Sequence, residues 1–222
     1  LMIDIAEMYC GGTADRDFND RINQEEYLRG INWAYDHFTV LTFDETPTVE
    51  DVLGAFQDYM QVTPMDGVSL DPLNDLKAGE KQSKYDYYYD ALSNIRRFIK
   101  KNKIAFYLVV HPGTAANRRR NDDGSRPAPN MSDVEYGSMF GNRADNFIVF
   151  HRNPQSENWN LTEIHIQKVK FQKLVGVPTP ETSPIALFYH YGTRRFRYLN
   201  QNGSPMDPIA MVDSKVKTNN IF

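Results

Sequence analysis

The stretch that decides the fold is Met65-Asp66-Gly67-Val68-Ser69-Leu70-Asp71-Pro72-Leu73-Asn74-Asp75-Leu76. Its segment 67–70 carries two apolar side chains in alternation and stops abruptly at Asp71 and Pro72. This pattern predicts a buried strand with a carboxylate at its C-terminal end. Ligands of open α/β sheets bind at that edge, where an aspartate can hold Mg²⁺ beside the phosphates of a nucleotide. The alternative is an aspartate that only begins a turn before proline.

A second strand is predicted for residues 104–110, which form a near-continuous apolar run. Such a run is typical of a strand buried on both faces of a sheet. It is followed by His111 and Pro112, as the first strand is followed by Asp71 and Pro72. Two strands that end in chemically capable side chains are therefore expected at one edge of one sheet.

The remaining elements follow from periodicity and capping residues. Asn23 and Thr48 precede helical patterns and are followed by carboxylates in the first turn. Helices are predicted over 1–10, 24–38, 49–60 and 85–102, and strands over 38–43, 144–152, 161–171 and 185–191. This order predicts an α/β fold with a mostly parallel twisted sheet flanked by helices, hairpins toward the C-terminus, one domain over 1–199 and a polar tail over 200–222.

Composition bounds the function classes. The chain has 222 residues, of which 41% are hydrophobic, and a net charge of −4. One globular domain with a real core is expected, and any nucleic-acid contact must be local because no global positive field exists. A single cysteine, Cys10, excludes an internal disulfide and fits a reducing compartment. No apolar run approaches the roughly 20 residues of a membrane span and no signal peptide is found, which indicates a soluble, cytoplasmic protein. The chain begins inside a helical pattern, so we expect a fragment of something longer.

The longest irregular segment covers residues 113–133. A loop of this length inside a compact domain is usually functional or disordered. Two interpretations of its basic side chains stay open, a solvated patch and a nucleic-acid contact, and the side chains concerned are Arg118, Arg119, Arg120 and Arg126.

Five short pieces, in this order and spacing, carry a family resemblance. They are Arg29-Gly30-Ile31-Asn32-Trp33-Ala34 with Asp36-His37-Phe38, Ser69-Leu70-Asp71-Pro72-Leu73-Asn74, Leu108-Val109-Val110-His111-Pro112, Gly137-Ser138 with Ala144-Asp145-Asn146 and Arg152, and Lys168-Val169-Lys170-Phe171 with Gly176. On these pieces the chain resembles the C-terminal motor domain of ring-shaped replicative helicases of the DnaB and Twinkle type, within the RecA-like ATPases.

The resemblance implies a nucleotide site that uses Mg²⁺ and ATP. Asp71 would orient Mg²⁺ and its water, and His111 would contact the γ-phosphate and report hydrolysis to the adjoining loop. Lys168 and Lys170 would reach the nucleotide of a neighbouring subunit and stabilise the transferring phosphoryl group. The remaining nucleotide-binding residues would be Asn74, beside the metal-holding aspartate, and Arg152 with Tyr189 or Tyr191, which would flank the base.

The resemblance also implies partners: single-stranded DNA and, for the parent protein, further copies of itself in a hexameric ring that unwinds DNA. The segments 74–85 and 112–133 would line the hole of the ring and track the DNA backbone electrostatically. The expected DNA-binding residues are Lys77, Lys81, Lys84, Arg118, Arg119, Arg120, Arg126, Gly137, Ser138 and Arg143.

Two departures from the family pattern stand out. The 222 residues contain no G-x-x-x-x-G-K-[ST] phosphate loop, so the chain is expected to hold one half of the nucleotide site, to lack a central strand and to be inactive alone. Lys170 stands where relatives place the arginine finger, and lysine lacks the planar two-pronged donor. Lys168 and Lys170 are expected on one face of a strand, about 7 Å apart, where they repel unless an anion lies between them.

Two other functions stay open. A metal-dependent phosphohydrolase could use Asp71, Asp75 and His111 if another ligand joined them, and the candidates for it are His151, His165 and His190. A non-catalytic module that only binds DNA or partner subunits is the second. The sequence also leaves open whether a primase module is attached to the parent protein.

Overall fold

The computed structural model describes residues 1–208 except 16, 18, 20, 80–82, 123 and 201. The chain divides into two compact units. Unit 1 contains residues 1–40, 148–166 and those from 178 onward, and unit 2 contains residues 41–147 and 167–177. The strands β3 (Asn146–His151) and β4 (Leu161–Val169) contribute residues to both.

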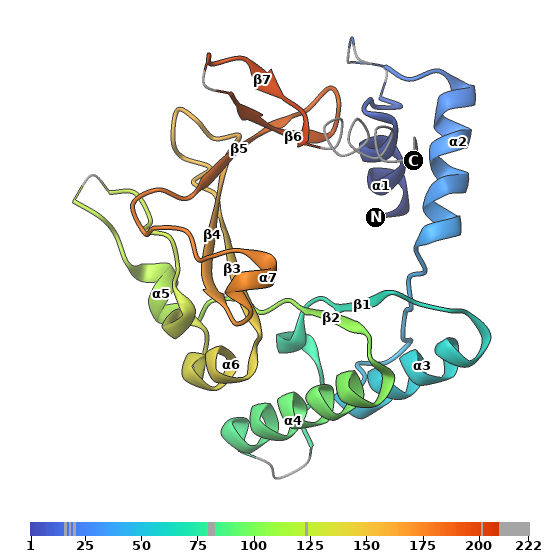
Figure 1. Cartoon of the computed structure of the whole chain (residues 1–222), viewed down its shortest axis with the longest axis vertical. Helices are drawn as coiled ribbons and strands as arrows, with labels where there is room; N and C mark the ends of the chain where they lie inside the picture. Colours follow the sequence, from blue (N-terminus) through green and yellow to red (C-terminus); the bar gives the residue numbers. More distant parts are fainter. Residues whose placement is uncertain are drawn as a thin grey trace. The chain divides into compact units, whose positions relative to one another are not determined.

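Unit 2 is built on two parallel strands and two helices. The strands β1 (Gly67–Leu70) and β2 (Ala105–Leu108) pair in parallel, from Gly67 opposite Ala105 to Leu70 opposite Leu108. The helices α3 (Val49–Val62) and α4 (Lys84–Asn102) both lie on one side of this pair, as Figure 1 shows. Strand β1 ends at Leu70, directly before Asp71, as the sequence pattern predicted.

Local capping explains where these helices begin. Thr48 accepts a hydrogen bond from the Asp51 backbone N–H while the Asp51 carboxylate accepts one from the Thr48 N–H, a reciprocal capping box. Ser83 caps α4 in the same sense by accepting from the Asp86 N–H. Each such cap contributes about 1 kcal/mol.

The core of unit 2 lies between the helices and the covered face of β1. Leu73 and Val49 are fully buried, and a fully buried aliphatic side chain contributes roughly 1.5–3 kcal/mol. The other buried members of this cluster are Val52, Leu70, Tyr87, Tyr88, Ala91, Leu92, Ile95, Val134, Met139 and Phe140.

Two expectations about strands are wrong. Strand β2 is not buried on both faces, because Tyr107 is 66% exposed and Ala105 is exposed too, on the face that α3 and α4 leave uncovered. Residues 38–43 form no strand: the described two-stranded sheet consists of β1 and β2, so this segment has no ladder to join. Its apolar residues Phe38, Val40 and Phe43 stay largely exposed.

Short helical turns complete unit 2. They are η1 (Leu73–Asp75), α5 (Thr114–Arg118), η2 (Met131–Asp133), α6 (Gly137–Arg143) and α7 (Gln172–Val175). The two ends of the long segment 113–133, which contains α5 and η2, are joined, because Gly113 N–H donates to Asp133 O at 2.7 Å and Pro112 forms a β-bridge with Val134.

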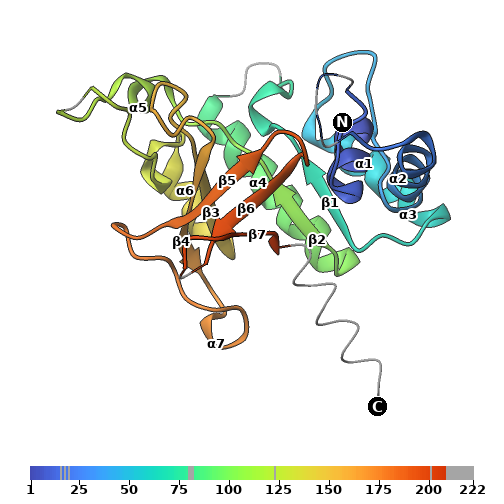
Figure 2. The ribbon, with the colours of Figure 1, turned by 90° about the horizontal axis from the view of Figure 1, so that it is seen from above.

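Unit 1 combines two helices with antiparallel strands. The helices α1 (Met2–Cys10) and α2 (Gln24–His37) pack side by side (Figure 1). Gly11, in the left-handed conformation, ends α1 at the end of the predicted helix 1–10. The strands β5 (Ile185–His190), β6 (Arg195–Leu199) and β7 (Pro205–Met206) extend the sheet in the order β3-β4-β5-β6-β7 (Figure 2). Pairing is antiparallel from β4 through β7.

The α/β class is thus confirmed, while the parallel part of the described sheets is limited to β1 and β2. The chain turns back from β5 to β6 within four residues, and a connection that short only permits antiparallel neighbours. The predicted hairpins account for this larger sheet. Strand β7 falls inside the stretch expected to be a tail, and the domain boundary at residue 199 stays a prediction.

A buried ion pair ties α1 to the β5–β6 turn. The Glu7 carboxylate, with 6% of its side chain exposed, accepts from Arg194 Nε at 3.1 Å and from the Thr13 hydroxyl at 2.9 Å. The next residue, Arg195, donates to the carbonyls of Met8 and Tyr9 at the C-terminus of α1. A guanidinium there satisfies carbonyls that have no partner within the helix and opposes their partial negative charge.

Candidate functional site

The parallel pairing of β1 and β2 places Asp71 and His111 beyond the carboxyl ends of neighbouring strands, as the sequence predicted. The pairing continues past the strands, since Val109 N–H donates to Leu70 O at 2.9 Å and Leu73 N–H donates to Val109 O at 3.0 Å. Both Asp71 and His111 are exposed. An exposed carboxylate at this edge is a suitable oxygen ligand for Mg²⁺, which needs only one or two carboxylates when phosphates supply the rest.

Asn74 connects these two strand ends. Its Oδ1 accepts from the His111 backbone N–H at 3.0 Å, and its Nδ2 lies 3.4 Å from the Tyr88 hydroxyl on α4. Burial raises the pKa of Tyr88, and the contact with Asn74 opposes that rise. The amide expected to touch a nucleotide is therefore engaged in fixing the backbone of His111.

Lys168 and Lys170 both have partners within unit 2. The Lys168 ammonium donates to Gly141 O at 2.7 Å, and the Lys170 ammonium lies 2.6 Å from Asp145 Oδ1. Lys170 is 44% exposed, so its ion pair is open to solvent. The repulsion expected between the two lysines is thus relieved within the same chain, by the Gly141 carbonyl for Lys168 and by the Asp145 carboxylate for Lys170.

The three residues expected to flank a base gather in unit 1. Arg152 Nη2 lies 3.2 Å from the Tyr191 hydroxyl, and the rings of Tyr191 and Tyr189 meet edge to face with centroids 4.8 Å apart. Trp159 joins them: its carbonyl accepts from Arg152 Nε at 2.7 Å and its ring centroid lies 5.1 Å from that of Tyr191. Trp159 was not predicted, because it lies in a connection where periodicity carries no signal.

The expected DNA-binding side chains differ in how freely they could meet a phosphate. Arg119 forms an ion pair with Asp133, and Lys84 lies 3.5 Å from Glu135. Lys81 lies outside the described residues. Arg120 Nη1 donates to the Arg119 carbonyl at 2.7 Å. Lys77, Arg118 and Arg126 are exposed.

Helix α6 carries three of the expected DNA-binding residues, of which Ser138 is exposed while Gly137 and Arg143 contact other parts of unit 2. Gly137 is buried, and a Cβ on it would stand 2.1 Å from Met131 O, so its role in the structure is close packing against η2. Arg143 lies over the ring of Tyr89 at 4.2 Å and contacts α4.

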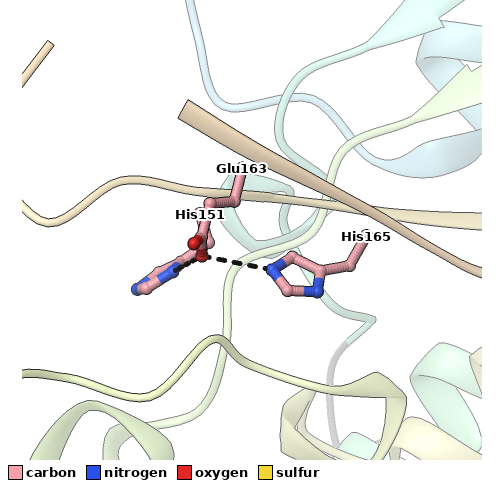
Figure 3. Close-up of side chains that lie close together, drawn as sticks. All are labelled: His151, Glu163 and His165. Carbon is pink, nitrogen blue, oxygen red and sulfur yellow. Dashed lines mark hydrogen bonds and ion pairs between the residues drawn. The ribbon is translucent and has the colours of Figure 1, made fainter. Parts of the chain in front are cut away.

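A further cluster joins His151, Glu163 and His165 (Figure 3). His151 and His165 were named above as candidate metal ligands, whereas Glu163 and the grouping of the three were not predicted. Among the described residues they are the one group of three or more His, Cys, Asp or Glu side chains close enough to hold a metal ion. Asp71, Asp75 and His111 are not in it, so the phosphohydrolase alternative gains no support. Glu163 and His165 are two residues apart on a strand, which could have suggested a shared face, but His151 joins them only through the fold.

Comparisons with known proteins agree on one kind of relative. The chain is 29% identical over 163 residues to the chloroplastic/mitochondrial Twinkle homolog protein of Arabidopsis thaliana, a match that covers 70% of this chain and 22% of that protein. The chain therefore spans about a fifth of its curated relative. No protein-family profile matches it.

Solved structures match over most of the chain. One solved ATPase domain has a TM-score of 0.65 at 15% identity, covering 88% of this chain and 68% of that one. A DnaB-like replicative helicase, solved to show its interactions with primase, has a TM-score of 0.64 at 14% identity and covers 88% and 46%. The resemblance to helicase motor domains of the DnaB and Twinkle type is confirmed, with the fold of their ATPase domains. Within the described residues, no helix is long and apolar enough to cross a bilayer.

Proposed function

We propose that this chain is part of the ATP-driven motor domain of a ring-shaped replicative DNA helicase. The observation that carries the proposal is the edge beyond β1 and β2, where Asp71 and His111 follow parallel neighbours and Asn74 joins the two strand ends. The similarity to a Twinkle homologue and to replicative-helicase ATPase domains supports it.

In this proposal Asp71 orients Mg²⁺, which would neutralise charge on the phosphates of ATP. His111 contacts the γ-phosphate. The long loop begins directly after His111, and its two ends are pinned by the hydrogen bond from Gly113 to Asp133 and the bridge from Pro112 to Val134. A displacement of His111 on hydrolysis would therefore be passed to both ends of the loop.

The other roles rest on the same proposal. Lys168 and Lys170 act on the nucleotide of the next subunit in a hexamer, and Arg152 with Tyr189 or Tyr191 flanks the base. Trp159 adds an aromatic surface to this cluster. Single-stranded DNA is tracked by the exposed arginines of the loop and by the lysines of 77–84. The cytoplasmic location stays a prediction.

The test uses the full-length protein that carries this chain and measures ATP hydrolysis stimulated by single-stranded DNA. Asp71→Asn should reduce turnover by at least about 10³-fold, because the metal-holding carboxylate is lost. Asp75→Asn, a second exposed carboxylate four residues away, is the matched control and should retain turnover. Equal losses in the two variants would favour the phosphohydrolase, and full activity of Asp71→Asn would refute the proposed site.

A further inference from the structure

The cluster of His151, Glu163 and His165 has the composition of a metal site. His151 ends β3, while Glu163 and His165 leave the same face of β4 because they are two residues apart on a strand. Figure 3 shows that both rings turn a nitrogen toward one carboxylate oxygen. His151 Nδ1 lies 3.0 Å and His165 Nε2 lies 3.4 Å from Glu163 Oε2.

These separations suit a shared metal ion. Zinc bonds nitrogen and carboxylate oxygen at about 2.0–2.2 Å in tetrahedral geometry, which puts neighbouring ligand atoms roughly 3.3–3.5 Å apart. The two distances to Glu163 fall close to that value, and one ligand atom from each residue lies within 4.8 Å of the others. Rotation about the side-chain bonds of the two histidines would complete the approach.

The ligand types select the kind of ion. Two imidazoles and one carboxylate suit zinc and its transition-metal neighbours, whereas Mg²⁺ and Ca²⁺ prefer oxygen ligands throughout. Three protein ligands leave the fourth position of zinc open to water. We propose that His151, Glu163 and His165 bind one Zn²⁺ ion, a site separate in its residues from the proposed nucleotide edge.

The cluster is partly buried, so an ion bound there would be held by packed histidine rings and would still contact solvent on one side. The side chains of His151 and His165 are 15% and 12% exposed, so their rings are held by packing, while Glu163 at 35% leaves an open side. His151 Nε2 is buried without a hydrogen-bond partner among the described residues. The fold therefore buries His151 Nε2 without a hydrogen bond and, by doing so, holds His151 Nδ1 beside the Glu163 carboxylate.

The bound ion would join β3 to β4 and thereby stabilise unit 1. It would also fix the end of β3, from which the chain continues into Arg152 and its aromatic neighbours. The proposal does not depend on helicase activity, and its test reads metal binding and unfolding rather than turnover.

The test uses the 222-residue chain, stripped with a chelator and titrated with Zn²⁺ in a calorimeter and with Co²⁺ in a spectrophotometer. One saturable equivalent is expected, with the visible absorption of tetrahedral cobalt and a rise in the melting temperature. Glu163→Gln and His165→Gln should each weaken binding by more than about 100-fold, since changes even outside the ligand shell cost 10- to 100-fold.

The control is His37→Gln, a histidine of unit 1 outside the cluster that hydrogen-bonds to the Trp33 carbonyl. It should leave affinity and stoichiometry unchanged. Circular dichroism of each stripped variant verifies folding, and if one ligand variant fails to fold, the other decides. Absence of saturable binding by the parent chain, or equal affinity in the parent and a folded ligand variant, would overturn the proposal.

Discussion

The Lys170 ammonium lies 2.6 Å from the Asp145 carboxylate, and both side chains are about half-exposed. The contact joins two of the sequence pieces that carry the helicase resemblance. A half-exposed ion pair contributes at most about 1 kcal/mol, so a more highly charged anion such as a triphosphate could draw Lys170 away at small cost.

The first prediction follows from this pair. In the full-length helicase, Lys170→Ala should lower ATP turnover by roughly 10³-fold while nucleotide binding stays nearly unchanged, because a finger acts on charge that develops in the transition state. Asp145→Asn breaks the same ion pair but keeps the lysine, so it should retain turnover. If Lys170 serves only the ion pair, steady-state assays will show the same small effect for both variants. Mixing Lys170→Ala subunits with Asp71→Asn subunits should restore some activity across the subunit boundary.

The second prediction concerns the 222-residue chain alone, which should hydrolyse ATP no faster than background. The sequence contains no phosphate loop, whose backbone N–H groups and lysine would bind the β- and γ-phosphates. A steady-state assay with Mg²⁺ decides this. Turnover that Asp71→Asn abolishes would contradict it.

The third prediction separates the arginines of the long loop. Arg118→Ala in the full-length protein should weaken binding of single-stranded DNA and reduce the slope of log K against log salt by about 0.7 if one phosphate contact is lost. Arg119 is paired with Asp133, which also caps η2, so Arg119→Ala should lower stability as well. Fluorescence titrations over a salt series measure the slope. Unchanged slopes for Arg118→Ala, Arg120→Ala and Arg126→Ala would make the loop a solvated patch.

The fourth prediction compares two glycines of unit 2. Gly137→Ala should destabilise the chain by about 2 kcal/mol or more, because its Cβ would stand 2.1 Å from a backbone oxygen that cannot move aside cheaply. Gly54→Ala, in the middle of α3 with open space around its Cβ, should stabilise it by about 0.5–1 kcal/mol. Urea unfolding of the two variants gives both values. A neutral Gly137→Ala would point back to DNA contact as the reason for glycine there.

The fifth prediction concerns alkaline stability. Burial raises the pKa of Tyr87 to about 12, and its hydroxyl has no hydrogen-bond partner among the described residues. The unfolded chain loses this proton near pH 10, so the stability that the neutral group contributes is present below about pH 10 and falls as the pH rises toward 12. Tyr87→Phe should therefore change the free energy of unfolding little at neutral pH. At pH 11 the parent chain should have lost about 1 kcal/mol of stability through Tyr87, and the Phe variant should not show this loss. Unfolding curves of the two proteins at pH 8 and pH 11 provide the comparison, and parallel losses would contradict it.

Local signals in the sequence predicted the helices well. Asn23 and Thr48 begin α2 and α3 with capping boxes, and Gly11 ends α1, because these contacts join residues only a few positions apart. The ends of β1 and β2 could be predicted for a similar reason, since an apolar run that stops at a polar residue and proline is a local pattern.

The features that the sequence did not predict depend on residues that are distant along the chain. Residues 38–43 have β-forming side chains, but a strand exists only where another strand pairs with it. The zinc cluster needs β3 beside β4 before His151 can meet Glu163, and no spacing within the chain encodes that meeting. Lys170 was expected to need a foreign anion, whereas Asp145 supplies a carboxylate from 25 residues away.

The two-stranded sheet of β1 and β2 has a practical consequence for anyone who handles this chain. Each strand has one neighbour in the described sheet, so each also presents a row of backbone groups that can pair with another chain, beside the exposed ring of Tyr107. Open strand edges of this kind promote aggregation, and a two-stranded sheet gains little stability of its own. The aggregated fraction of the 222-residue chain should therefore rise with protein concentration. A charged side chain at an exposed position of β2, as in Ala105→Lys, should reduce that fraction.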